Sequence, residues 1–333
     1  MRRLLVLTVL GTVCATGPAS AQAPAAPAPA AGVTGVGNFS HIVADMDRAL
    51  KFYRDVLGLE VTQDQPFSPN PAIMKLGNTP GAQSRFIALR VPGSDMGVEL
   101  IQYKDIDRRP LSRRFVDPGA TNLALRVRDL APILAKVPGS GARFLTPGGK
   151  PAAIGAGQYV FLQDPDGFVV ELAQVAPPAD SKVPATSNIF GAGFELTVTN
   201  IENTTKFYRD LLGITFAPAG GWNSDKVMTA TAGAPGTSFR QAQGRIPGSS
   251  TTFTLIQFRN VVKATALGGR VQDPGTAILQ LRVPDVAGMT RKMDTWAAPV
   301  LTTGGVPVEI RTGLKIVLVK DPDHLVLELM QSN

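Results

Sequence analysis

Cysteine and histidine are almost missing from this sequence of 333 residues, which contains one Cys and two His. With Cys14 as the only cysteine, the chain can form neither an internal disulfide nor a thiolate metal centre. His41 and His324 lie in different halves of the chain, whereas an iron site of two histidines and one carboxylate needs both in one pocket. We therefore expect no iron centre of that kind.

Apolar runs of the about 20 residues that span a bilayer are absent as well. The shorter run Leu4–Val13 follows two arginines and precedes the small residues Ala19–Ala21. This three-part pattern is typical of a cleavable secretory signal. We predict a signal peptide over residues 1–21, whose removal takes Cys14 with it, and a secreted or periplasmic mature protein without a stable membrane anchor.

The distribution of charge along the chain does not favour a nucleic-acid partner. The formal net charge is +7, and the basic residues are scattered rather than gathered on one segment. We therefore expect no nucleic-acid binding. Residues 22–35 consist mostly of Ala, Pro and Gly, which predicts an extended tether.

An internal repeat organises the rest of the chain. The pair Phe52-Tyr53 returns 155 residues later as Phe207-Tyr208, and the segment Asp164-Pro-Asp returns 157 residues later as Asp321-Pro-Asp. So small a drift predicts a duplicated domain, over residues 36–175 and 189–331, joined by a proline-containing linker at 176–188.

A capped helix opens each copy. Asp45 and Asn200 are predicted N-caps, and Gly58 and Gly213 are predicted left-handed stops. Strand-like runs separated by Pro- and Gly-rich turns follow the first of these helices, and from residue 121 a strand, a short helix and three strands repeat the order. We therefore predict four βαβββ modules, two in each copy, and an α+β fold class.

The run Val43-Ala-Asp-Met-Asp-Arg-Ala-Leu-Lys-Phe-Tyr-Arg-Asp-Val-Leu-Gly-Leu, the segment Asp164-Pro-Asp-Gly-Phe-Val-Val-Glu-Leu and the four-module order resemble the vicinal oxygen chelate superfamily. This superfamily includes glyoxalase I, bleomycin and fosfomycin resistance proteins and extradiol dioxygenases. The resemblance covers nearly all of residues 36–175 and 189–331. It implies cup-shaped mixed sheets in which up to four side chains, usually His, Gln or Glu, hold a divalent metal. A fold of this kind carries many chemistries.

Carried over position by position, the resemblance implies a first-domain set of metal ligands: Asn38, Glu99, Asn122 and Glu171. The first position falls on Asn38 rather than on His41, because strand alternation turns His41 toward the helix. The same positions in the second domain are Gly193, Thr254, Ile278 and Glu328, so we expect the second site to be degenerate.

The first-domain set contains only oxygen ligands. Such a set suits Mg²⁺, Mn²⁺ or Ca²⁺ better than Zn²⁺ or Fe²⁺. Without a cation, one of the two carboxyl groups would be protonated or would accept a hydrogen bond from a neighbour such as Arg126. Both alternatives, one bound cation or none, stay open.

Three functions of different classes follow. The first is a lyase, isomerase or dioxygenase-type enzyme acting on a small oxygenated compound, in which Glu99 and Glu171 carry a proton or hold the metal. The second is a metal-free protein that captures a small molecule without catalysis, as the resemblance to bleomycin resistance proteins implies. The third is a scaffold whose duplicated domains serve only interaction. Four aromatic residues and the loops at 63–80 and 218–237 are available to line the pocket: Phe67, Phe86, Tyr103 and Trp222. The sequence leaves a monomer and a homodimer equally open.

Overall fold

The fold is described from a computed structural model, which covers residues 32–154, 157–262 and 269–332. The predicted signal peptide and most of the predicted tether lie outside these residues. Residues 32–35, which the prediction assigned to the tether, are packed against the protein: Val33 is buried and donates its N–H to the Leu212 carbonyl oxygen. Residues 32–35 therefore belong to the folded domain and not to the expected tether.

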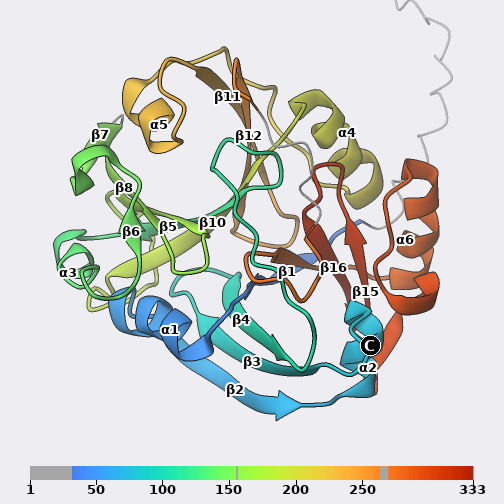
Figure 1. Ribbon diagram of the computed structural model, residues 1–333. Helices are drawn as coiled ribbons and strands as arrows, with labels where there is room; N and C mark the ends of the chain where they lie inside the picture. The colour runs from blue at the N-terminus through green and yellow to red at the C-terminus, as the bar shows by residue number, and fades with distance from the viewer. Residues whose placement is uncertain (1–31, 155–156, 263–268, 333) are drawn as a thin grey trace, which may run out of the picture. The chain divides into compact units, whose positions relative to one another are not determined.

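Four modules follow one another along the chain, as predicted (Figure 1). The elements of the first are β1 Gly35–Ile42, α1 Met46–Leu50, a π-helical continuation Lys51–Val56, β2 Glu60–Ser68, α2 Pro71–Gly77, β3 Gln83–Arg90 and β4 Gly97–Lys104. Those of the second are β5 Thr121–Val127, α3 Ala131–Leu134, β6 Arg143–Phe144, a 3-10 turn Pro147–Gly149, β7 Ala152–Ile154, β8 Gly157–Gln163 and β9 Val169–Gln174.

The third and fourth modules repeat this plan. The third contains β10 Ile189–Thr197, α4 Ile201–Leu212, α5 Lys226–Thr231, β11 Ser238–Arg245 and β12 Thr252–Arg259. The fourth contains β13 Ala277–Arg282, α6 Val286–Met293, the 3-10 turns Asp294–Trp296 and Thr303–Gly305, β14 Val308–Arg311, β15 Leu314–Lys320 and β16 Val326–Ser332. In the third module only isolated bridges at Phe216 and Asn223 stand where β2 stands in the first.

The predicted helix signals act where the sequence places them. Asp45 accepts a hydrogen bond from the Arg48 N–H, and Asn200 accepts one from the Asn203 N–H. Gly58 and Gly213 both have positive φ, which ends the helix without the steric cost that a Cβ would bring. The copies differ in one respect, because the first helix widens into a π-helix after Leu50 while α4 stays α-helical to Leu212.

The modules pair in an order that the repeat did not reveal. One mixed sheet, sheet A, has the order β14-β15-β16-β13-β1-β4-β3-β2 and so joins the first module to the fourth. The other, sheet B, has the order β11-β12-β10-β5-β9-β8-β6 with β7 paired to β8, and joins the second module to the third. The predicted α+β class with cup-shaped mixed sheets is confirmed, but each curled sheet takes strands from both sequence halves.

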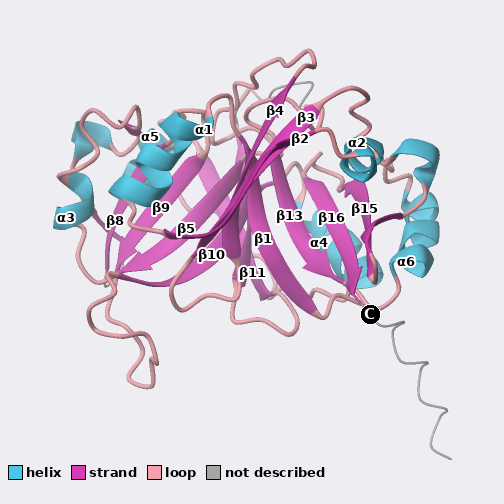
Figure 2. Ribbon diagram, turned by 90° about the horizontal axis from the view of Figure 1, so that it is seen from below, coloured by secondary structure: helices cyan, strands magenta, loops and turns pink. Residues whose placement is uncertain are grey.

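One apolar core lies behind both sheets. Phe39 on β1 and Phe194 on β10 are fully buried and meet edge to face with ring centroids 4.8 Å apart. Figure 2 shows the strands of both sheets running through the middle of the protein, with α2 and α6 at one end and α3 at the other. The described residues between 32 and 332 belong to one compact unit. Among the described residues, no helix has the length and apolar character needed to cross a membrane.

Candidate functional site

Each sheet encloses a cavity on the side away from the shared core. We name the hollow of sheet A cup A and that of sheet B cup B. The cavity of cup A measures about 580 Å³ and that of cup B about 370 Å³. Both values fall in the range of roughly 300–1,000 Å³ that is usual for small-molecule sites.

The expected set of four ligands is divided between these cups. Asn38 on β1 and Glu99 on β4 line cup A, whereas Glu171 on β9 lines cup B and Asn122 on β5 donates a hydrogen bond to it. The reason is the pairing of modules, since β1 lies beside β13 and not beside β5. One ion therefore cannot contact all four residues, and the expected first-domain set is corrected accordingly.

Cup A contains a different set of four. Besides Asn38 and Glu99 it is lined by Gln280 on β13 and Glu328 on β16, which stand opposite each other in the parallel register of these strands. The sequence argument had assigned Ile278 in place of Gln280. Both residues line cup A, because positions two apart on a strand face the same side.

Hydrogen bonds hold the polar floor of cup A in place. Ser40 Oγ donates to Glu99 Oε2 at 2.8 Å, and Gln280 Nε2 donates to the same oxygen at 3.0 Å. Gln280 Oε1 in turn accepts the backbone N–H of Asn38 at 2.8 Å. The Gln280 amide is thus fixed at both ends and orients the Glu99 carboxylate.

The carboxyl groups of cup A lack a nearby positive charge. Burial raises the pKa of Glu99, and burial together with the charge of Glu99 raises the pKa of Glu328 to about 8. Arg311 on β14 is the only basic residue among the described residues that line the cavity, and it lies exposed at the edge. A proton or a bound cation must therefore neutralise this floor.

The residues present fit a hard cation. Glu99, Glu328 and the side-chain oxygen of Asn38 offer oxygen atoms, the ligand type that Mg²⁺, Mn²⁺ and Ca²⁺ prefer. The Gln280 carbonyl is already engaged with the backbone, so Gln280 acts as a partner of Glu99 rather than as a free ligand. In the part of the chain that the structure describes, no group of three or more His, Cys, Asp or Glu side chains forms a metal cluster.

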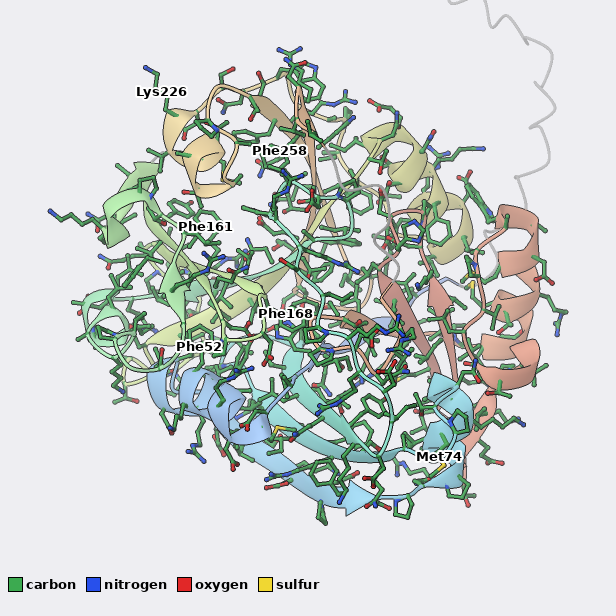
Figure 3. All side chains as sticks on the ribbon, in the orientation of Figure 1. Phe52, Met74, Phe161, Phe168, Lys226 and Phe258 are labelled. Carbon is green, nitrogen blue, oxygen red and sulfur yellow. The ribbon has the colours of Figure 1, made fainter. Side chains whose placement is uncertain are left out.

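Some of the apolar residues that line cup A were predicted from the sequence. Phe86 and Tyr103 line the cavity as expected, together with Ile73 and Leu76 of α2 from the predicted loop segment. Phe67 instead lies under the ammonium group of Lys104, at 4.6 Å from its ring centroid. Figure 3 shows Met74 on the same helix, α2, beside the strands of sheet A.

Cup B presents a second acidic pair. Asn122 Nδ2 donates to Glu195 Oε2 at 2.6 Å and to Glu171 Oε2 at 3.4 Å, and Asn122 Oδ1 accepts the backbone N–H of Glu171. Burial and then the charge of Glu195 raise the pKa of Glu171 well above its usual range, and burial raises the pKa of Glu195 to about 7. The sequence argument missed Glu195. Arg126 lines the cavity but, among the described residues, donates no hydrogen bond to either carboxyl group.

His41 is a packed residue, as predicted. It is fully buried, stacks on Phe168 with centroids 3.8 Å apart, and its Nδ1 lies 2.5 Å from the Tyr53 hydroxyl. That hydroxyl donates to Asp164, so His41 Nδ1–H is the donor of the first bond. Burial lowers the pKa of His41 to about 3, which keeps the ring neutral.

Comparison with known proteins agrees with this architecture. Residues 35–172 match the family described as the Glyoxalase/Bleomycin resistance protein/Dioxygenase superfamily. A curated protein of Synechocystis sp. (strain ATCC 27184 / PCC 6803 / Kazusa), named a probable lactoylglutathione lyase, is 24% identical over 138 residues, which cover 41% of this chain and 93% of that protein.

Solved structures are similar over a longer stretch. Glyoxalase I from Zea mays superposes with a TM-score of 0.60 at 17% identity, covering 89% of this chain and 92% of that chain. A mutant of the same Zea mays enzyme gives a TM-score of 0.61 at 17% identity, over 89% of this chain and 93% of that chain. At this level of identity the likeness concerns the fold.

Proposed function

We propose that the chain is an exported enzyme of the Glyoxalase/Bleomycin resistance protein/Dioxygenase class with its active site in cup A, because residues 35–172 match that family. Its substrate would be a small compound with neighbouring oxygen atoms. The observation that carries the proposal is the meeting of Asn38, Glu99, Gln280 and Glu328 on the floor of one cavity.

The residues of cup A would have different roles in binding and catalysis. Glu99, Glu328 and Asn38 would hold a divalent cation, which when bound supplies a Lewis acid for the substrate oxygens. Burial raises the pKa of Glu328 to about 8 in the absence of a cation, so Glu328 would hold a proton near neutral pH and could return it to the substrate as a general acid. Gln280 keeps Glu99 oriented, and Arg311 at the edge can pair with an oxygen-rich end of the substrate.

The first test is metal content. Purified mature protein is analysed for bound elements and titrated calorimetrically with Mg²⁺, Mn²⁺, Ca²⁺ and Zn²⁺, beside Glu99→Gln, Glu328→Gln and the cup B control Glu171→Gln. We expect one hard cation per chain, lost in both cup A variants and retained in the control. Retention in the cup A variants, or loss in the control alone, would contradict the assignment.

A metal-free binding protein is the second candidate, and one observation favours it. The Gln280 carbonyl, which stands at the cup floor, is already bonded to the Asn38 N–H and is not available to an ion. A wild-type protein that binds no cation, yet gains thermal stability with a small oxygenated ligand, would favour capture over catalysis.

Export is proposed from the N-terminal pattern alone. Expression of the full chain in a Gram-negative host, followed by cell fractionation and N-terminal sequencing, tests it. We expect a periplasmic product that begins near Gln22. A product that keeps Met1 and stays in the cytoplasm would refute the proposal.

A further inference from the structure

Cup B has lost the polar side chains that define cup A, but it has not become an apolar hollow. The positions that match Asn38, Glu99 and Gln280 carry Gly193, Thr254 and Ala124. Its two carboxyl groups, Glu171 and Glu195, are instead placed side by side with one amide between them. This arrangement suggests that cup B binds a ligand different from that of cup A.

Two polar side chains in cup B have an oxygen atom that no described residue hydrogen-bonds: Oγ1 of Thr254 and Oε1 of Glu171. Thr254 is 7% exposed and lines the cavity, and no described residue hydrogen-bonds to its hydroxyl. Glu171 is 8% exposed, and among the described residues its only side-chain bond is the long one from Asn122, made to Oε2. Buried polar groups are normally satisfied, so these two mark places where a ligand atom can bind.

The charges around the acidic pair specify the sign of that ligand. Asp225 at the start of α5 adds a further negative charge to the lining. Lys226 beside it is exposed and points to the outside of the protein (Figure 3). Arg126 is the one basic residue in the described lining, and it pairs with neither Glu171 nor Glu195. Tyr159 on β8 adds no charge.

A metal ion is a poor occupant of this floor. Asn122 directs its NH₂ group at both carboxylates, while its carbonyl oxygen is taken by the Glu171 backbone N–H. An ion placed between the carboxylates would share their oxygens with these N–H donors, as it would with Gln280 in cup A. Cup B in addition lacks the amide oxygen that Asn38 offers in cup A, because the matching position is Gly193. An ammonium group has its own donors and can reach Glu171, Glu195 and the Thr254 hydroxyl from the cavity side.

Arg126 gives the ligand a second end. It lies on β5 two residues beyond Ala124, on the same side of the strand, and Ala124 stands in register with Glu171. Neighbours of this kind are about 7 Å apart along a strand. The half-buried Arg126 makes no ion pair or hydrogen bond with any described residue, so its guanidinium is available to a carboxylate. Phe161, Phe239 and Tyr159 add aromatic side chains to the same lining, which suit a ring and a cation near its face.

We infer that cup B binds a small aromatic aminocarboxylate, with its ammonium group on Glu171 and Glu195 and its carboxylate toward Arg126. This site is separate from cup A and does not depend on the activity proposed there. It takes a zwitterion, whereas cup A is built for a hard cation and an oxygen-rich compound.

The test uses 4-(aminomethyl)benzoate as the probe, with benzylamine and 4-(hydroxymethyl)benzoate as probes that each lack one charge. Isothermal titration of the full mature protein compares wild type with Glu195→Gln, Glu171→Gln, Arg126→Gln and the cup A control Glu99→Gln. Glutamine keeps the size of the carboxyl group and an acceptor for Asn122, and circular dichroism and thermal melting confirm that each variant is folded.

We expect one binding site for 4-(aminomethyl)benzoate, weakened at least about tenfold in Glu195→Gln and in Glu171→Gln and unchanged in Glu99→Gln. Arg126→Gln should bind 4-(aminomethyl)benzoate no better than benzylamine, because the bond to the carboxylate is then gone. The inference is overturned if wild type shows no binding at millimolar probe, if the hydroxymethyl compound binds equally well, or if Glu99→Gln alone abolishes binding. The last result would move the amine to cup A.

Discussion

Cup A and cup B are built by the same pairing of modules, yet they place their acidic groups on different strands. In cup A the residues in register are Ser40 on β1 and Glu99 on β4. In cup B the matching residues are Glu195 on β10 and Thr254 on β12. The hydroxyl and the carboxyl group have exchanged strands between the two copies.

The next pair along these strands shows the same exchange. Asn38 stands opposite Gly97 in cup A, and Gly193 stands opposite Thr252 in cup B. Each glycine makes room for its polar neighbour: a Cβ would lie 2.5 Å from Asn38 Oδ1 at Gly97 and 2.5 Å from Thr252 Oγ1 at Gly193. The duplicated cups thus keep one large polar side chain per pair and change only the strand that carries it.

The amide side chain that lies between the carboxyl groups also changes its position between the cups. Gln280 in cup A and Asn122 in cup B occupy positions two residues apart on equivalent strands, and both donate to a glutamate. A cup that has lost the family's ligand positions can therefore still be a polar site. What changes is the set of other polar side chains that line the cavity, which includes Asn38 in cup A and Thr254 and Arg126 in cup B.

The largest effect is expected where the two cups meet. Phe39→Ala and Phe194→Ala should each lower the free energy of unfolding by about 3–5 kcal/mol, because both rings are fully buried in one shared core. Chemical denaturation followed by fluorescence and circular dichroism measures the loss, and the double variant should lose less than the sum. If one substitution costs under about 1 kcal/mol, the two sheets do not share a cooperative core.

Features that depend on neighbouring residues could be predicted from the sequence, whereas features that depend on contacts between distant segments could not. The capped helices, the glycine stops and the four modules rest on local signals, and the structure has them at Asp45, Asn200, Gly58 and Gly213. Module pairing is not local. β13 and β5 are equivalent strands, and nothing in the sequence says which of them lies beside β1.

The prediction of the site residues faced a second ambiguity. Strand alternation has a period of two, so Asn122 and Ala124, or Ile278 and Gln280, face the same side and cannot be distinguished by direction. The sequence argument chose the earlier residue of each pair, and it thereby missed Gln280. Glu195 was missed because its counterpart Ser40 is no family ligand position.

The next prediction concerns the pH dependence of stability. Burial raises the folded-state pKa of Glu328 to about 8, far above its unfolded value of about 4.3. The unfolded state therefore loses its proton first, and the stability of the wild type falls as pH rises from about 4.3 to about 8. Glu328→Gln does not titrate, so we expect it to be as stable as wild type at pH 4.5 and about 2–4 kcal/mol more stable at pH 8.5.

Denaturation in EDTA at both pH values measures this difference, and Glu195→Gln in cup B is the matched comparison. Its effect should have the same sign and a smaller size, because the pKa of Glu195 is raised only to about 7. Added Mg²⁺ or Mn²⁺ should restore the wild-type stability only through cup A. Equal restoration in Glu328→Gln would contradict the difference between the cups.

A smaller effect distinguishes the two tyrosines of the repeat. The Tyr53 hydroxyl contacts both His41 and Asp164, whereas the Tyr208 hydroxyl donates to Asp321 alone, since Leu196 replaces the histidine. Tyr53→Phe leaves two buried groups without a partner and Tyr208→Phe leaves one. At about 1–3 kcal/mol for each such group, Tyr53→Phe should be the more destabilising by at least about 1 kcal/mol.

Urea denaturation of both tyrosine variants at pH 7 makes this comparison. The double variant His41→Leu/Tyr53→Phe serves as its control, because it places at position 41 the leucine that the third module has at Leu196 and so removes the unpaired histidine nitrogen. We expect it to recover part of the loss. If Tyr53→Phe and Tyr208→Phe cost the same, the histidine bond makes no net contribution to stability.

The smallest effect is expected at the helix caps, where the copies use different residues for one task. Asp45 accepts the Arg48 N–H at 2.8 Å and Asn200 accepts the Asn203 N–H at 2.9 Å, so Asp45→Ala and Asn200→Ala should each cost about 1 kcal/mol. Asp45→Asn keeps the acceptor and loses only the charge near the helix N-terminus, which predicts a loss of about 0.3–1 kcal/mol that salt diminishes. Thermal melts at low and high salt separate the two contributions. An Asp45→Asn variant as unstable as Asp45→Ala would mean that charge, and not the hydrogen bond that both copies share, sets the first turn of the first helix.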